Sequence, residues 1–268
     1  MGSGTEYRFY REGDWKLLVW RQTWTQGLWA EVLRHLRGQV PAHHPQTTTL
    51  CYPPDGRGQE FYLKIYHQSD LLGTIKDLFR RSKAFRALKQ SEALLREGFH
   101  TPRAVAAGEK RTLRFIRKAF LLTLSVEGTS LPLFLQENCC DASDSRPLRR
   151  KREYLRQLAF EIRRLHQFGF VHGDLVPYNI LVQMQGDGVN FVYVDNDRTR
   201  RYPRWFPHAL WRRNLVQLNR FFLPGISKRD RVRFFRFYLG CRRCGKKERR
   251  LLRWLDEKTQ NRVRARNE

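Results

Sequence analysis

The chain contains two short stretches that decide its fold, VHGDLVPYNILV at residues 171–182 and VYVDNDR at residues 192–198. They place Asp174, an asparagine at Asn179 and a second aspartate, Asp195, close to apolar runs. Magnesium prefers oxygen ligands and usually shares its coordination shell with substrate phosphates, so two protein ligands suffice. The pattern therefore predicts a phosphoryl-transfer site, in which one carboxylate holds the nucleophile and two oxygens hold Mg²⁺ beside a triphosphate.

Each of these residues also has a plainer interpretation. Asp174 could cap a loop, and Asn179 could be a turn residue before a strand. The apolar runs Ile180–Val182 and Phe191–Val194 lie on either side of the turn at residues 186–188, which predicts a β-hairpin. Because the ends of such a hairpin would carry both candidate metal ligands, the combination favours the phosphoryl-transfer site.

The pattern H-G-D-x-x-x-x-N-I-L-V, followed by an apolar strand and D-x-D-R, resembles the catalytic and metal loops of the protein-kinase-like superfamily. Within it, the pattern is most similar to the bacterial lipopolysaccharide kinases, which phosphorylate Kdo or heptose sugars of the inner core. That family often ends its metal loop in Asp-Phe-Asp-Arg, whereas residues 195–198 here read Asp-Asn-Asp-Arg. Protein kinases have Asp-Phe-Gly at this place, so Asp197 argues against protein substrates. The resemblance covers about residues 50–200.

The resemblance implies an enzyme that uses ATP and Mg²⁺, with Asp174 as the catalytic base. Asn179 and Asp195 would be the metal ligands. Lys64 would bind the ATP phosphates and would be positioned by Glu92.

The residues around Lys64 and Glu92 are compatible with these roles. Lys64 interrupts the apolar strand at residues 61–66, so it points either to solvent or into a cleft. Glu92 is in phase with Phe85, Leu88 and Leu95 on one helical face, and a buried carboxylate needs a cation nearby. The alternative is that Glu92 lies at the edge of this face in water.

Four further residues receive roles from their place in the chain. Glu127 and Gly128 follow a strand and would form the hinge between two lobes, where backbone groups can meet adenine. Arg198 could contact the phosphate or an acidic sugar, because its donors form a planar fork. His172 is interpreted as a structural hydrogen-bonding residue and not as the base.

The expected fold is α+β and bilobal, of the protein-kinase-like type, with a small β-rich N-lobe and a mainly helical C-lobe. The N-lobe would be residues 1–126, an antiparallel sheet with one long helix. The C-lobe would be residues 127–268, with the catalytic loop, the metal loop and a basic helical C-terminus. No G-x-G-x-x-G loop is present, and Arg21–Gly27 could replace it with backbone amides or Thr side chains.

Hydrophobic periodicity and turn residues place the individual elements. Residues 15–66 are expected to form strands and turns, and residues 138–150 a loop. The expected strands are Trp15–Trp20, Thr47–Tyr52, Glu60–Tyr66 and Ala119–Val126, and the expected helix before the catalytic loop is Lys151–Phe168.

Two helices are expected after Asp197. Leu215, Leu218 and Phe222 form the apolar stripe of the first. Ser227 and Asp230 form an N-terminal cap of the second, whose stripe is Val232, Phe235 and Leu239.

The chain has a net charge of +26, and its C-terminal part from residue 198 holds 23 Lys and Arg against 5 Asp and Glu. Such a field attracts polyanions, namely anionic lipid, lipopolysaccharide or nucleic acid. The basic helices could lie against an anionic bilayer or could simply cover a lobe. No signal peptide and no apolar run of membrane-spanning length is visible. A cytoplasmic enzyme, peripheral on the inner face of the inner membrane, is therefore expected.

Five cysteines do not form a disulfide framework in a chain of 268 residues. Cys139, Cys140, Cys241 and Cys244 could in principle make a zinc site, although two adjacent ligands are awkward. Reduced thiols are the plainer interpretation.

The predicted function is phosphorylation of a Kdo or heptose hydroxyl of the lipopolysaccharide inner core. One alternative is another phosphotransferase of the same fold, such as an antibiotic kinase or a RIO-type protein kinase. A second is a nucleic-acid-binding protein that uses its Arg-rich tail. A third is a catalytically silent pseudokinase. No nucleic-acid motif is present, so nucleic acid is not the expected partner, and no obligate protein partner is inferred.

Overall fold

The structure is a computed structural model. It describes residues 6–37, 46–53, 58–67, 81–112, 115–139, 145–186, 188–203, 205, 209–221, 223 and 225–267. The chain forms two compact units. The N-terminal unit comprises Met1–Val126 together with Asn196–Arg198, and the C-terminal unit comprises Glu127–Asp195 together with Thr199–Glu268.

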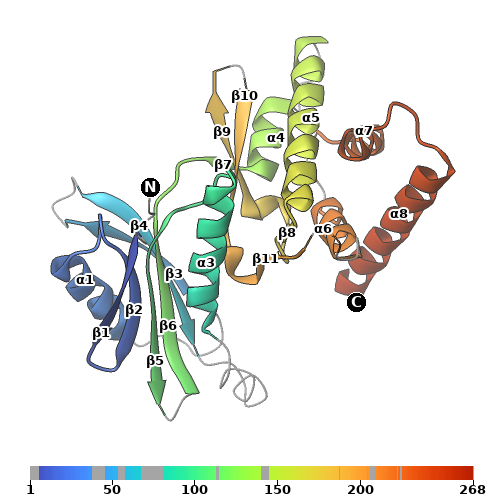
Figure 1. Cartoon of the computed structure of the whole chain (residues 1–268). Coiled ribbons are helices and arrows are strands. Elements are labelled where there is room, and N and C mark those ends of the chain that lie inside the picture. The colour runs from blue at the N-terminus through green and yellow to red at the C-terminus, as the bar shows by residue number, and fades with distance from the viewer. Residues whose placement is uncertain are drawn as a thin grey trace, which may run out of the picture. The chain divides into compact units, whose positions relative to one another are not determined.

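The N-terminal unit is built on a six-stranded antiparallel sheet with the order β1-β2-β5-β6-β4-β3 (Figure 1). All four strands expected from the sequence are present, and β1 and β5 are additional. The strands are β1 (Tyr7–Glu12), β2 (Trp15–Trp20), β3 (Gln46–Tyr52), β4 (Gln59–His67), β5 (Ala104–Thr112) and β6 (Phe115–Leu124).

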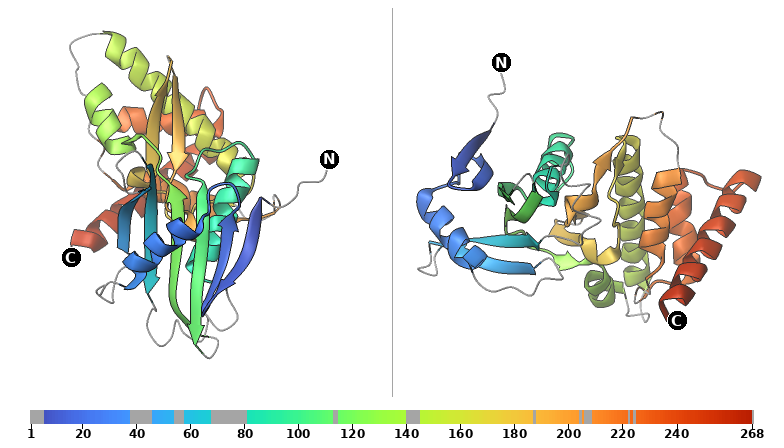
Figure 2. Two further views of the ribbon diagram at one scale, coloured as in Figure 1. Left: turned by 90° about the vertical axis from the view of Figure 1, so that its left-hand side faces the viewer. Right: turned by 90° about the horizontal axis from the view of Figure 1, so that it is seen from below.

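Two helices cover opposite faces of this sheet, α1 (Gln26–Arg37) and α3 (Lys83–Arg96). In the left view of Figure 2, α1 lies in front of the sheet and α3 behind it. Leu63 of β4 belongs to the hydrophobic cluster of α1, and Tyr66 of the same strand belongs to the cluster of α3. Since successive side chains of a strand point to opposite faces, Lys64 lies on the α3 face.

Helix α1 corrects two expectations, because residues 15–66 were expected to contain only strands and turns and the N-lobe only one helix. Leu28, Val32 and Leu36 of α1 are buried against the sheet. The hydroxyl of Thr25 accepts a hydrogen bond from the backbone N–H of Leu28 (3.1 Å) and thereby caps the helix. The second half of Arg21–Gly27 is therefore a helix start, and a role of this segment in phosphate binding stays a prediction.

In the C-terminal unit, a β-hairpin lies beside α4 and α5, and the remaining helices lie on the far side of α5 (Figure 1). The hairpin forms a three-stranded sheet with the order β10-β9-β7, and β11 pairs with β8. The strands are β7 (Thr129–Ser130), β8 (Phe170–Val171), β9 (Ile180–Gln185), β10 (Gly188–Tyr193) and β11 (Arg200–Arg201). The α-helices are α4 (Leu131–Cys139), α5 (Ser145–Gln167), α6 (Ala209–Asn219), α7 (Lys228–Leu239) and α8 (Lys246–Asn267), and η1 (Pro177–Asn179) and η2 (Asn196–Arg198) are 3₁₀ turns.

Helix α5 begins earlier than expected, because residues 145–150 are helical and not part of a loop. Pro147 occupies the first turn of this helix, where a missing N–H breaks no intrahelical hydrogen bond. Residues 140–144 lie outside the described residues. Proline is typical of loops, but it is equally compatible with a helix start.

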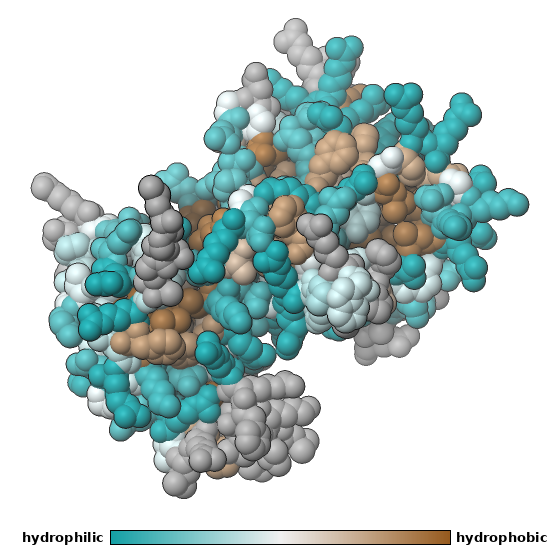
Figure 3. Space-filling view, in the orientation of Figure 1, coloured by the Kyte–Doolittle hydropathy of each residue, from teal (hydrophilic) through white to brown (hydrophobic). Residues whose placement is uncertain are grey.

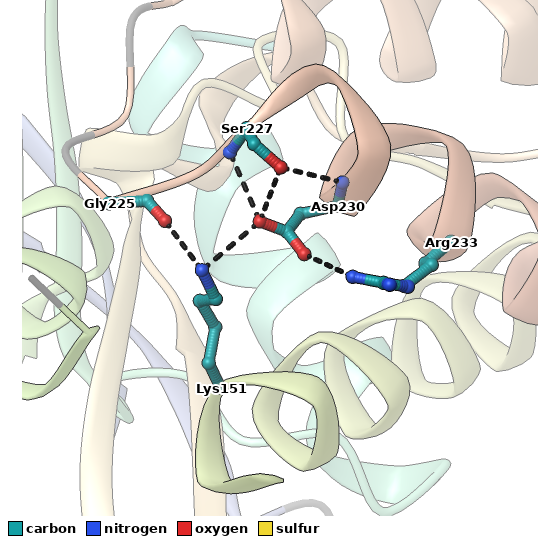
Figure 4. A network of polar contacts seen from close by, with 5 residues as sticks. All are labelled: Lys151, Gly225, Ser227, Asp230 and Arg233. Atoms are coloured by element: carbon teal, nitrogen blue, oxygen red, sulfur yellow. Dashed lines mark hydrogen bonds and ion pairs between the residues drawn. The ribbon is translucent and has the colours of Figure 1, made fainter. Parts of the chain in front are cut away.

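Helix α7 is attached to α5 by a buried carboxylate (Figure 4). Asp230 is 2 % exposed, and it forms the predicted capping box with Ser227. Its Oδ2 lies 3.1 Å from Lys151 Nζ of α5. Burial disfavours the charged form of Asp230, but hydrogen bonds from Ser227 and Lys151 outweigh it and lower its pKa. Val232, expected in the buried stripe, is 46 % exposed, and Phe234 is buried in its place beside Phe235.

Candidate active site

The catalytic loop starts from a glycine that no other residue could replace without strain. Gly169 follows α5 with φ +83°, and a Cβ there would lie 2.1 Å from the carbonyl oxygen of Tyr202. Gly173, two residues after β8, also has a positive φ of 77°. These two positions turn the chain out of α5 and direct Asp174 away from the buried strand β8.

The predicted hairpin is confirmed, and its register brings the two loops together. Tyr193 of β10 pairs with Ile180 of β9. One step further, the backbone N–H of Val194 donates to the carbonyl oxygen of Asn179 (3.0 Å). Asn179 and Asp195 therefore lie at the same end of the hairpin, on adjacent strands.

His172 fixes the other backbone group of Val194. Its Nε2 lies 3.0 Å from the carbonyl oxygen of Val194, which can only accept, so Nε2 carries the proton. Complete burial lowers the pKa of His172, although Asp195 and Asp174 act in the opposite direction. The imidazole is therefore neutral, and its hydrogen bond links the catalytic loop to the end of the strand before Asp195.

Asn179 is held so that one of its oxygens is available. Its Nδ2 donates to the backbone carbonyl of Asp174 (2.9 Å). The same carbonyl accepts from the N–H of Val176 (2.8 Å), so the backbone of Asp174 is fixed at two points. The amide oxygen Oδ1 of Asn179 is then directed away from Asp174.

Asp195 adopts a left-handed conformation with φ 61°, and it is the only non-glycine residue with positive φ among the described residues. Such a backbone conformation is strained for most side chains but tolerated by Asp and Asn. Strain of this kind gathers at functional sites. The Asp195 side chain is exposed at the end of the hairpin.

Two oxygen donors, one amide and one carboxylate, suit a hard cation such as Mg²⁺ and not zinc. Among the described residues, no three His, Cys, Asp or Glu side chains converge. The zinc hypothesis involved Cys140, which lies outside them. None of the described helices is both long enough and apolar enough to cross a bilayer.

A pair of buried amides from α6 supports the catalytic loop, and the sequence analysis missed both. Gln217 donates to the carbonyl oxygen of Gly173 (2.8 Å) and accepts from the N–H of Leu175 (3.2 Å), on either side of Asp174. Asn214, which is fully buried, accepts from the N–H of His172 (3.0 Å) and donates to Gln217 (3.0 Å). The available signal was two amides beside the buried leucines of α6.

Asn214 is itself positioned by His166, at the end of α5. Nε2 of His166 lies 3.3 Å from Asn214 Oδ1, and Nδ1 lies 2.8 Å from the hydroxyl of Tyr238. Burial lowers the pKa of His166 to about 4, so this imidazole is neutral at pH 7. It donates through Nε2 and accepts from Tyr238.

In the N-terminal unit, Lys64 and Glu92 are on the same side of the sheet. Lys64 Nζ lies 5.5 Å from the ring centre of Tyr66, which packs in the cluster of α3. Glu92 is 8 % exposed on the inner face of α3, and Tyr7 of β1 donates to its Oε1 (2.7 Å). Burial and the Glu92 carboxylate raise the pKa of Tyr7. Tyr7 is a partner of Glu92 that the sequence analysis did not predict.

Asn196, which replaces the phenylalanine usual in the metal loop, is buried beside α3. It is 5 % exposed, and its Nδ2 donates to the hydroxyls of Thr101 (2.7 Å) and Ser91 (3.4 Å). Ser91 directly precedes Glu92 on α3. A polar contact thus joins the residue after Asp195 to the helix that carries Glu92.

The comparison with protein families identifies the chain. The model of the lipopolysaccharide kinase (Kdo/WaaP) family matches residues 49–238. The chain belongs to this family. The resemblance noted in the sequence is thereby confirmed, and this lipopolysaccharide kinase is a phosphotransferase that acts on a sugar hydroxyl of the lipopolysaccharide core. Neither another class of kinase nor a nucleic-acid-binding protein is favoured.

Two relatives and one solved structure are similar to this kinase. The 3-deoxy-D-manno-octulosonic acid kinase of Mannheimia succiniciproducens is 28 % identical over 196 residues, 70 % of this chain and 75 % of the relative. That of Pasteurella multocida is 27 % identical over 229 residues, 82 % of each. The structure of WaaP in complex with acyl carrier protein has a TM-score of 0.64 and 22 % identity, covering 95 % of this chain and 98 % of that one. The last likeness confirms the predicted fold class.

The remaining two predicted site residues are exposed. The Glu127 side chain is in solvent. The backbone carbonyl of Glu127, one of the groups expected to meet adenine, already accepts a hydrogen bond from Gln183 Nε2 (2.7 Å). Arg198 is exposed in η2. The structure thus groups Asp174, Asn179 and Asp195 in this kinase's C-terminal unit, and Lys64 and Glu92 in its N-terminal unit.

Proposed function

We propose that this lipopolysaccharide kinase transfers the terminal phosphate of ATP to a hydroxyl of Kdo in the inner core. The observation that carries the proposal is the hairpin end. There Val194, which precedes Asp195, is bonded through its backbone to Asn179 and to His172, and the Asn179 side chain is bonded to the backbone carbonyl of Asp174. Kdo is preferred to heptose because both curated relatives described above are Kdo kinases.

Asp174 accepts or orients the proton of the acceptor hydroxyl. Its backbone carbonyl accepts from Asn179 and Val176, and Gln217 bonds the residues on either side of it, so the backbone that carries the carboxylate is held in place. Rigid placement of a general base is worth about 10²–10⁴-fold in rate. His172 is neutral and already bonded to Val194, which leaves the proton transfer to Asp174.

Asn179 and Asp195 would hold Mg²⁺, which supplies positive charge against the developing charge of the transferred phosphate. Lys64, positioned by Glu92, binds phosphate oxygens of ATP, and backbone groups at Glu127 meet the adenine. Arg198 recognises the phosphate or the carboxylate of the acid sugar, because a guanidinium matches either geometry. Catalysis rests on placement and charge neutralisation, as expected for phosphoryl transfer.

The test is incubation of the purified protein with ATP, Mg²⁺ and Kdo-bearing lipid A, followed by mass spectrometry of the acceptor. We expect one added phosphate, and we expect Asp174→Asn to lower kcat by about 10²–10⁴-fold with little change in the KM for ATP. The matched control is Asp14→Asn, an exposed aspartate in the turn between β1 and β2 of the N-terminal unit. Full activity of Asp174→Asn would remove the assigned role, and phosphorylation of heptosylated core alone would correct the acceptor.

We further propose that the enzyme works as a peripheral protein at the cytosolic face of the inner membrane. The support is the excess of basic residues after residue 198, carried on α6, α7 and α8. Binding to anionic vesicles should weaken as salt rises, because exposed charges are screened. Salt-insensitive binding, or none, would contradict this part of the proposal and leave the kinase intact.

A protein partner is a separate possibility to test, since WaaP was solved in complex with acyl carrier protein. The net charge of +26 would favour a partner that carries negative charge. Co-purification of this chain with acyl carrier protein at low salt, lost at high salt, is the expected result. Failure to co-purify at any salt concentration would contradict it.

A further inference from the structure

A basic pocket lies between α5 and α7, inside the C-terminal unit and away from the hairpin. Its volume is about 420 Å³. Four guanidinium groups and two phenyl rings line it, those of Arg152, Arg233, Arg236, Arg242, Phe160 and Phe237. In Figure 3, hydrophobic residues (brown) show between hydrophilic ones (teal) in the region of α5 and α7.

The pocket is separate from the site of phosphoryl transfer. Phe160 is the lining residue nearest the end of α5, and Gln167 is the last residue of that helix. At 1.5 Å per residue, they are about 10 Å apart along the axis, and the catalytic loop begins beyond Gln167. The hairpin β9–β10 and α7 contact different sides of α5 (Figure 1, Figure 2).

The positive charge of the pocket is only partly balanced by the protein. Arg233 pairs with Asp230 (2.9 Å), but Asp230 is shared with Lys151, as Figure 4 shows. Across the described part of the chain, Arg152, Arg236 and Arg242 have no ion pair with a carboxylate. The Nε of Arg236 is buried and has no hydrogen-bond partner.

A fifth guanidinium, that of Arg163 on α5, lies close to Gly240. Gly240 has φ +70°, and a Cβ there would lie 2.2 Å from a terminal nitrogen of Arg163. The positive φ requires this glycine for the turn after α7, and the absence of a Cβ leaves room for the end of the Arg163 side chain. Like charges gathered in this way repel each other, and a bound anion would relieve the repulsion.

The geometry of the pocket selects among anions. Guanidinium groups donate through planar forks that match phosphate oxygens, and several of them can serve one dianion. Phe160 and Phe237 meet edge to face with ring centres 6.3 Å apart, and Arg156 stacks 5.7 Å from the centre of Phe160. These rings offer an apolar wall to the organic part of a phosphate ester.

We infer that this pocket is a second anion site that binds a phosphate group, either of a small phosphate ester or of a lipid headgroup. The inference does not depend on the identity of the sugar acceptor. Cys241 lines the same pocket; it forms no disulfide, and it is hydrogen-bonded to Cys244. A phosphate bound here shields this thiol and disfavours its thiolate, which makes Cys241 a reporter of occupancy.

The experiment measures the rate of alkylation of Cys241 in the full chain by iodoacetamide, at constant ionic strength. Trypsin separates Cys241 from Cys244, because Arg242 and Arg243 lie between them. Cys51, a half-buried thiol of the N-terminal unit, is the internal control. Inorganic phosphate at ten times its dissociation constant should slow Cys241 about ten-fold and leave Cys51 unchanged, because only the free fraction reacts.

Vesicles distinguish the two sources of phosphate. Protection by inorganic phosphate identifies a site open to small esters. Protection by phosphatidic acid vesicles, but not by phosphatidylcholine vesicles or by inorganic phosphate, identifies a lipid headgroup site. If neither probe slows Cys241, or if Cys51 is slowed equally, the inference is overturned.

A pair of matched variants tests the lining residues. Arg152→Gln with Arg236→Gln removes two charges from the pocket, and Arg249→Gln with Arg250→Gln removes two from the exposed face of α8. Protection of Cys241 should be lost in the first pair and kept in the second. Equal loss in both would show a diffuse charge effect and overturn the site. Should the first pair fail to fold, the contrast between Cys241 and Cys51 in the unaltered chain still decides.

Discussion

Replacing Gln217 by methionine tests whether α6 holds the catalytic loop in its active geometry. The side chain is 3 % exposed and makes three hydrogen bonds, with Gly173, Leu175 and Asn214. Methionine has a similar volume, so the change leaves three polar groups without partners and creates little empty space. Each buried group left unpaired costs about 1–3 kcal/mol. Gly173 is only half-buried and can recruit water, so we expect a loss of about 2–5 kcal/mol in the free energy of unfolding.

The effect on catalysis follows from the position of the two backbone contacts. They lie on either side of Asp174, so their loss lets the carboxylate move. A displacement of about 1 Å can cost 10²-fold in rate, and we expect kcat to fall by about that factor. Kinase activity is measured at a temperature where urea unfolding shows the variant to be folded. Gln217→Glu keeps the acceptor oxygens but faces the carbonyl of Gly173 with a second acceptor, so it should also lose activity.

Gln157→Met is the matched control. Gln157 lies on α5 and accepts from the N–H of Val189 (3.3 Å), near the turn of the hairpin and away from both loops. We expect less than about 1 kcal/mol of destabilisation and an unchanged kcat. If folded Gln217→Met retained kcat within two-fold of the unaltered enzyme, or matched Gln157→Met in stability, the supporting role of α6 would be refuted.

Three further changes test the polar contacts of the fold. Asn196→Leu removes the hydrogen bonds to Thr101 and Ser91, so the free energy of unfolding should fall by about 1–3 kcal/mol. The control is Asn190→Leu on the hairpin surface, which should leave the free energy of unfolding unchanged. His166 has a folded pKa of about 4, below the unfolded value of about 6.5. Its contribution to the free energy of unfolding is therefore complete above pH 6.5 and declines by about 3 kcal/mol as pH falls to 4. Urea unfolding measured against pH should show this decline, and His166→Gln should flatten it. Asp230 has a lowered folded pKa, so its contribution to stability is present above the unfolded pKa of about 3.9 and is lost as pH falls further. Asp230→Asn should lower the free energy of unfolding by about 3–5 kcal/mol at pH 7, because buried Lys151 loses its counter-charge. An Asp230→Asn variant whose stability still fell in acid as in the unaltered chain would contradict the assignment.

Much of the candidate site could be predicted because its backbone conformation demands particular residue types. The backbone has a positive φ at residues 169, 173 and 195. Glycine occupies the first two positions and Asp195 the third, and both residue types tolerate this conformation, so the sequence itself indicates it. The alternation of apolar residues in the hairpin likewise fixes which ends of β9 and β10 meet. Local rules were sufficient for these features.

Contacts between distant residues could not be predicted in the same way. Gln217 and Gly173 are 44 residues apart, and Tyr7 and Glu92 are 85 apart, so nothing local links them. Lys64 was considered as the partner of Glu92, but a tyrosine hydroxyl on a strand not expected from the sequence also reaches this carboxylate.

The missed helix α1 is a different kind of error. Leu28, Val32 and Leu36 recur every four residues, and Thr25 precedes them as a cap, so the helical signal was present. The expectation for residues 15–66 is strands and turns throughout, which leaves this signal unused. The early start of α5 was missed because Pro147 was interpreted as a breaker, although proline is common in a first helical turn.

The hairpin has a consequence for how this family can vary in length. The spacing between Asn179 and Asp195 is set by the pairing of Tyr193 with Ile180, and not by the number of residues between the strands. Insertions at the turn near Gly186 and Gly188 should therefore be neutral, even when they are long. A single deletion inside β10 would instead shift every following residue to the opposite face and carry Asp195 away from its partner. Natural relatives should therefore vary in length at the turn and keep a constant length within β10.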